Sequence, residues 1–115
     1  MPYLQIRVSC AVSYEQKEEI VKDLSPKIVM LPGKSEEKFM IEIVDQCDLY
    51  FGGSKEKTNA YINLCINAYL DKEYLEAYTK EVCTCLNKVL KIDYSQIFIT
   101  HQVLSPWIYA PVIMK

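Results

Sequence analysis

The chain repeats itself along its length, and this repeat restricts the fold more than any other feature of the sequence. Residues 2–9 align without a gap with residues 60–67, an offset of 58 positions, and the same offset places residues 39–41 opposite residues 97–99. Few aligned residues are identical, but size and polarity are kept. A repeat of this kind indicates a duplicated structural unit.

The first unit has the pattern of a strand, a helix and a second strand. Apolar and polar side chains alternate over residues 3–8, which is the period of a strand. Ser13 followed by Gln16 predicts a capping box at the start of a helix. Pro26 falls within the apolar stripe of that helix, and we expect a kink or a broken turn there with the helix continuing beyond it. Residues 38–44 predict the second strand.

The second unit has the same order of elements. Asp71 is the expected N-cap of a helix whose apolar residues recur every three to four positions, and residues 95–102 predict the closing strand. The two units, about residues 2–44 and 60–102, therefore predict one domain over residues 1–115.

Two such units predict an α/β (α+β) fold of duplicated β-α-β units, with a four-stranded mixed sheet and two helices on one face. The right-handed crossover makes the two strands of each unit parallel. The other face of the sheet is left uncovered, yet apolar side chains are expected on both faces. The residues assigned to the uncovered face are Tyr3, Phe39, Tyr61 and Ile97, whereas Leu4 and Ile62 are assigned to the covered face. We therefore predict oligomerisation through the open face of the sheet.

Charge and composition exclude several classes of function. The net charge is −2, so no nucleic acid or anionic membrane partner is expected, and the apolar runs are too short to span a bilayer. Five cysteines without a Cys-x-x-Cys pair and the absence of a signal peptide predict reduced thiols in a cytoplasmic protein. With one histidine, His101, and no metal-binding spacing, no metal is expected.

Pro2 comes after the initiator methionine and leads directly into the first strand. A small second residue usually permits removal of the methionine, and removal here would leave a secondary amine at the chain terminus. Such an amine has a pKa of about 7.7–8.0, which burial lowers, so it can act as a general base. Alternatively, the proline is only a processing signal.

Two further motifs lie downstream of Pro2. Gly33-Lys34 ends the first helical region, where a lysine is usually a solvated charge, and residues 50–54 read Tyr-Phe-Gly-Gly-Ser, which alone suits a linker turn. Together with Pro2, in this order and spacing, they resemble the macrophage migration inhibitory factor family of the tautomerase superfamily. The resemblance covers nearly the whole chain.

This resemblance implies a homotrimeric barrel with active sites between subunits. Pro2 matches the catalytic base of the family, and Lys34 matches the lysine that holds the substrate carboxylate. A backbone N–H of Ile66 or Asn67 would contact the substrate. Phe98 of a neighbouring subunit falls where many members have a pocket tyrosine, and Thr100 falls where many have an asparagine.

The chemistry expected from this set is keto–enol tautomerisation of a small aromatic or aliphatic 2-keto acid, without cofactor. A base near C3, a cation for the carboxylate and a donor for the oxygen are required. Tyr3, Ile66, Phe98 and Trp107 are expected to form apolar walls. The alternative is a cytokine-like or interaction protein of the same fold with vestigial tautomerase activity, which would imply leaderless secretion.

Overall fold

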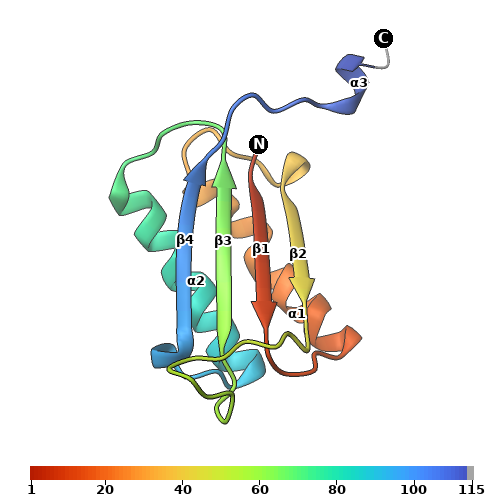
Figure 1. The fold of residues 1–115 in the computed structure, drawn as a ribbon. Coiled ribbons are helices and arrows are strands. Elements are labelled where there is room, and N and C mark those ends of the chain that lie inside the picture. The colour runs from red at the N-terminus through yellow and green to blue at the C-terminus, as the bar shows by residue number, and fades with distance from the viewer. Residues whose placement is uncertain (114–115) are drawn as a thin grey trace.

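The computed structural model describes residues 1–113, which form one layer of sheet and one layer of helices (Figure 1). The strands are β1 (Tyr3–Val8), β2 (Met40–Val44), β3 (Ala60–Ile66) and β4 (Ile97–Val103). The α-helices are α1 (Tyr14–Leu24), α2 (Lys72–Leu90) and the short α3 (Ala110–Ile113). Short 3-10 helices cover Pro26–Met30, Glu36–Lys38 and Tyr94–Gln96. Residues 114–115 of the predicted domain lie outside the described residues.

The predicted duplication is confirmed in the order of the strands and of the two main helices. The 58-residue offset superposes the start of α1 at Tyr14 on the start of α2 at Lys72, and it carries the 3-10 helix Glu36–Lys38 onto Tyr94–Gln96. The sheet order is β2-β1-β3-β4, with β1 parallel to β2, β3 parallel to β4, and β1 antiparallel to β3. The sheet is therefore mixed, as predicted, and α1 and α2 lie on the same face (Figure 1).

The core lies between the sheet and these two helices. Alternate strand residues face the helices and are fully buried, among them Leu4, Ile6, Ile62 and Leu64. Tyr78 of α2 is also fully buried; its ring meets Phe39 edge-on, and its hydroxyl donates to the Leu24 carbonyl at 2.9 Å. That bond satisfies the hydroxyl inside the core, because a buried polar group without a partner is costly.

The helix boundaries differ from the prediction at Pro26. The capping box is present, with the Ser13 hydroxyl accepting from Gln16 N and the Gln16 side chain accepting from Ser13 N. However, α1 ends at Leu24 rather than continuing through a kink, and the chain proceeds as the 3-10 helix Pro26–Met30. Pro26 has no N–H to donate to an earlier carbonyl, so the α-helical ladder stops and shorter i→i+3 bonds replace it.

The open face of the sheet is more polar than predicted. Phe39 and Ile97 pack against the core, so their assignment to the uncovered face was wrong. Polar side chains occupy the middle of that face and bond across strands, with Asn63 donating to Gln102 at 2.7 Å and Gln5 donating to Glu42 at 2.9 Å. The exposed apolar residues that remain on this face are Met40, Tyr61 and Phe98.

Candidate active site

The candidate site lies at the end of the sheet where β1 begins and β3 ends. Pro2 is buried directly before β1, and its carbonyl accepts a hydrogen bond from Met40 N at 3.2 Å. Figure 1 shows the N-terminus at this end, with the segment after β4 crossing over it toward β2. Segments far apart in sequence therefore converge on Pro2.

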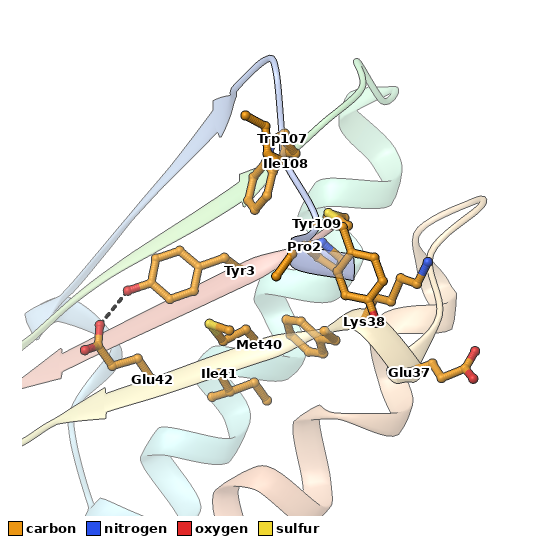
Figure 2. A pocket seen from close by; sticks show the side chains of 13 residues that line it. Pro2, Tyr3, Glu37, Lys38, Met40, Ile41, Glu42, Trp107, Ile108 and Tyr109 are labelled. Atoms are coloured by element: carbon orange, nitrogen blue, oxygen red, sulfur yellow. Dashed lines mark hydrogen bonds between the residues drawn. The ribbon is translucent and has the colours of Figure 1, made fainter. Parts of the chain in front are cut away.

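A cavity of about 880 Å³ opens beside Pro2. Its walls are formed by residues 1–3, by residues 37–42 and by residues 107–110 (Figure 2). Most of these side chains are apolar. The volume is within the usual range for a small-molecule site, about 300–1,000 Å³, and the cavity can hold an aromatic or short aliphatic acid.

Lys34 is brought near this end of the sheet by a turn. Gly33 has a φ of 77°, in the left-handed region that glycine adopts without strain, and Lys34 N donates to the Leu31 carbonyl at 3.1 Å. The Lys34 ammonium donates to the Asn67 side-chain oxygen at 2.5 Å, and Asn67 comes directly after β3. The structure thus brings Lys34 and Asn67 together.

The electrostatic environment disfavours a protonated amine at the N-terminus. The pKa of the Met1 amine is lowered, first by burial and then by the positive charges of Lys34 and Lys38. All three effects raise the free energy of the charged form, so they act in the same direction. In this structure Pro2 nitrogen is part of the Met1-Pro2 amide; removal of Met1 would place an amine at the Pro2 nitrogen.

Tyr3 is held in the cavity wall by a polar contact on the open face. Its hydroxyl donates to Glu42 at 2.5 Å (Figure 2). Gln5 donates to the same carboxylate oxygen at 2.9 Å. The hydrogen bond to Glu42, aided by burial, raises the pKa of Tyr3 to about 12, while the same bonds lower the pKa of Glu42. Tyr3 is therefore a neutral, oriented ring at physiological pH.

Trp107 reaches the cavity from the segment after β4. Its indole N–H donates to the Leu104 carbonyl at 2.6 Å, and Leu104 N donates to the Ile66 carbonyl at 2.8 Å. These bonds tie the tail to the end of β3 and turn the ring toward Pro2. Trp107 and Tyr3 are the two predicted wall residues that the structure places in this cavity.

Ile66 and Phe98 do not line the cavity within one chain. The Ile66 side chain is fully buried in the core and is not among the residues that line this cavity. Phe98 pairs with Tyr61 at the opposite end of β3, where its ring stacks on Phe51 at a centroid distance of 5.0 Å. Thr100 bonds to Tyr61 and Asn63 on the open face of the sheet.

Several cavity residues were not predicted from the sequence, among them Lys38, Met40 and Tyr109. In the sequence, nothing distinguishes Lys38 from other charged loop residues, and Tyr109 belongs to a C-terminal segment without periodicity. No local signal identifies either one, because their approach to Pro2 depends on how distant segments pack. Met40 can be derived from strand alternation once β2 is placed next to β1, since Met40 pairs with Tyr3.

Residues 1–113 lack two features that would point to other kinds of site. They contain no cluster of three or more histidine, cysteine, aspartate or glutamate side chains able to hold a metal ion. No helix in the same range is long and apolar enough to cross a bilayer.

Known proteins share this fold over nearly the whole chain. The family model described as macrophage migration inhibitory factor matches residues 1–111, whereas no curated protein matches the chain by sequence. Among solved structures, Leishmania major MIF2 superposes with a TM-score of 0.83 at 19% identity, covering 93% of each chain. The macrophage migration inhibitory factor-like protein of Entamoeba histolytica gives 0.81 at 23% identity, covering 94% of each. A fused 4-OT described as a symmetric trimer gives 0.78 at 17% identity, covering 90% of this chain and 88% of that one.

Proposed function

The chain belongs to the macrophage migration inhibitory factor family of the tautomerase superfamily, and from this premise we propose that it is a keto–enol tautomerase of small, phenylpyruvate-like 2-keto acids. The Pro2 amine, exposed by removal of Met1, is the general base. The observation that carries the proposal is the buried Pro2 in the wall of an 880 Å³ cavity. Similarity of fold alone would not support this function, because one fold hosts many functions.

The reaction moves one proton and needs no cofactor. The Pro2 nitrogen takes a proton from C3 of the keto acid, and the C–H electron pair becomes the C2–C3 double bond as the carbonyl oxygen takes a proton from water. The protonated Pro2 then returns its proton to the hydroxide, which restores both the base and the water. In this proposal Lys34 holds the carboxylate, and a backbone N–H of Ile66 or Asn67 donates to the substrate. Tyr3 and Trp107 form apolar walls that keep the amine dry.

The surroundings of the N-terminus suit a base. A free terminal amine has a pKa of about 7.7–8.0 and is mostly protonated at pH 7. Burial, Lys34 and Lys38 lower the pKa of the Met1 amine, and the same groups act on a Pro2 amine in nearly the same place. A larger neutral fraction at pH 7 is the expected result.

A homotrimer completes the proposed site. Phe98 lies at the end of the sheet opposite Pro2 and is 64% exposed, so only a second subunit can bring it to the cavity. Exposed Met40 and Phe98 supply apolar surface for that contact. Light scattering at micromolar concentration should give about three times the 13.4 kDa chain mass; a stable monomer would contradict the assembly.

The direct test is phenylpyruvate enolisation by protein whose loss of Met1 has been verified by mass spectrometry. Tautomerase activity is expected for processed protein and is expected to be lost when Met1 is retained. Equal activity of the two forms would refute Pro2 as the base. Titration of the Pro2 nitrogen by ¹⁵N NMR separates enzyme from binding module, because a cytokine-like protein of the same fold has no need of a lowered pKa.

A further inference from the structure

A second cavity, of about 450 Å³, lies at the end of the sheet opposite Pro2. It is lined by residues 49–52, residues 59–61 and Phe98, so it lies where β3 and β4 begin, beside the loop that joins β2 to β3 (Figure 1). Its volume is within the usual range for a small-molecule site. The proposed reaction at Pro2 does not use this cavity.

Four of the side chains that line this second cavity are aromatic, and contacts hold three of them in place. The rings of Phe51 and Phe98 are stacked, with centroids 5.0 Å apart and an interplanar angle of 27°. Two backbone hydrogen bonds between Phe51 and Ser54 close the turn that carries the first ring. Tyr61, the neighbour of Phe98 in the sheet, has its hydroxyl bonded to Thr100 at 2.6 Å. These walls suit a flat apolar molecule.

Asn59 supplies a polar group to this cavity. The residue is only 2% exposed, and its side-chain NH₂ donates to the carbonyls of Leu49 at 3.0 Å and Lys57 at 3.3 Å. These two bonds fix the orientation of the amide, because only its nitrogen can donate. The Oδ1 at the other end of the amide accepts no hydrogen bond from residues 1–113.

The Asn59 Oδ1 is therefore an acceptor that opens onto the cavity. Every fully enclosed side-chain nitrogen or oxygen atom of the described residues has a hydrogen-bond partner. An Oδ1 without such a partner must then reach open space, and the second cavity is the space that Asn59 lines. An acceptor in a nearly buried residue is costly to leave without a donor, so a ligand that brings a donor is favoured there.

The charges around this cavity favour a neutral ligand. No charged residue is among the described residues that line it. Lys55 lies outside the lining, with its ammonium 5.4 Å from the centroid of the Tyr50 ring, and it pairs with Asp48 at 2.7 Å. A carboxylate in the cavity would therefore lose its hydration without gaining a cation, and it would face the Asn59 oxygen. The cavity is unsuited to the keto acids proposed for the Pro2 site.

We propose that this second cavity is a ligand site of its own, which binds a small neutral aromatic molecule carrying an N–H or O–H donor, such as an indole or a phenol. The ligand ring lies against the aromatic walls, and its donor bonds to the Asn59 Oδ1. The site is separate from the Pro2 cavity, which lies at the other end of the sheet. It does not depend on the tautomerase function.

The test compares indole with benzofuran, which has the same shape but a ring oxygen in place of the N–H. Both are titrated into the full-length protein, in the assembly it forms in solution, and binding is followed by protein NMR. Indole should bind roughly fivefold more tightly, the difference expected for one neutral hydrogen bond. Apolar contact alone would favour the less polar benzofuran. Equal binding, tighter binding of benzofuran, or no saturable binding because a neighbouring subunit fills the cavity would overturn the proposal.

The same titration locates the ligand. The chemical shifts of the Asn59 side-chain amide and the Gly52 backbone amide should change with indole, since both residues line the second cavity. Shift changes confined to residues 37–42 and 107–110 would place indole in the Pro2 cavity instead and overturn the proposal.

Two matched tyrosine variants separate the cavities. Tyr50 and Tyr109 are both exposed, each has a lysine ammonium over its ring, and each lines one cavity. Tyr50→Ala should weaken indole binding about threefold or more, whereas Tyr109→Ala should not change it. The reverse pattern would refute the site. Asn59→Ala should remove the preference for indole over benzofuran, and a preference that survives would also refute it. If Asn59→Ala fails to fold, the comparison of the two ligands on wild-type protein decides.

Discussion

The two repeat units have one plan and differ in the length of their helices. In the second unit α2 runs unbroken for 19 residues, whereas in the first α1 stops after 11 and a 3-10 helix comes next. The 58-residue offset places Pro26 of the first unit at Thr84, in the middle of α2. One proline therefore accounts for the difference in helix length, because it lacks the N–H that the ladder needs.

The turns after the two helical regions have equivalent backbone conformations, but the residues that follow them have different roles. Gly33 and Lys91 occupy matching positions, and both have positive φ, 77° and 59°. The next residue is Lys34 in the first unit and Ile92 in the second. Lys34 reaches Asn67 near the N-terminus, whereas Ile92 is fully buried in the core. The same backbone turn therefore precedes a core residue in the second unit and a candidate site residue in the first unit.

The largest expected effect is at the start of the first unit. Pro2→Gly keeps a terminal amine but loses the fixed ring geometry, and we expect tautomerase activity to fall about a hundredfold or more, since general-base catalysis contributes about 10²–10⁴-fold. The steady-state rate with phenylpyruvate measures it. The matched change in the second unit, Ala60→Gly, should leave the rate unchanged; an equal loss there would mean that the effect is structural.

Exchanging the residues at the matched helix position tests the role of Pro26. Thr84→Pro should cost about 3 kcal/mol of unfolding free energy, because it removes a helical hydrogen bond and clashes with the Lys80 carbonyl, to which Thr84 now donates at 2.9 Å. Pro26→Thr should change stability by less than about 1 kcal/mol. Urea unfolding measures both, and similar losses at the two positions would contradict the comparison.

The next effect concerns the residues after the two turns. Lys34→Ala should raise KM for phenylpyruvate about tenfold to a hundredfold, because a hydrogen bond to a charged group is worth about 1.5–3 kcal/mol. The KM for phenylpyruvate ethyl ester, which lacks the carboxylate charge, should change little. The control Lys91→Gly, which also removes a lysine charge, should leave KM unaltered. Equal losses for acid and ester would refute the role of Lys34.

The smallest effect is on pH dependence. Since burial and two lysines lower the pKa of the terminal amine, the active neutral form is reached at a lower pH than for a free amine. Activity should therefore rise with pH through one ionisation below about 7.7. Lys34→Ala should move that ionisation upward by less than one unit. A pH–rate profile measures it, and a downward shift would be inconsistent with the electrostatic argument.

Much of the fold was predictable because its signals are local. Alternation over residues 3–8, the capping box at Ser13 and the 58-residue repeat each depend on neighbours or on a fixed offset. The α1 boundary was missed because Pro26 can either kink a helix or end it, and the packing of the residues after it decides which. Phe39 and Ile97 were placed on the wrong face because each lies where a 3-10 helix meets its strand, so alternation could not be counted from a known start.

Periodicity and spacing are properties of the chain alone, and they were enough to predict the duplicated β-α-β plan, the parallel pair of strands in each unit and the position of Pro2 at the start of a strand. They also singled out Lys34, which comes after a glycine at a turn. In contrast, the meeting of Lys38, Trp107 and Tyr109 around Pro2, and the position of Phe98 at the other end of the sheet, became known only from the folded molecule. The reason is physical: such contacts depend on strand order and on the path of the tail across the sheet, and these arise from packing between residues far apart in the chain.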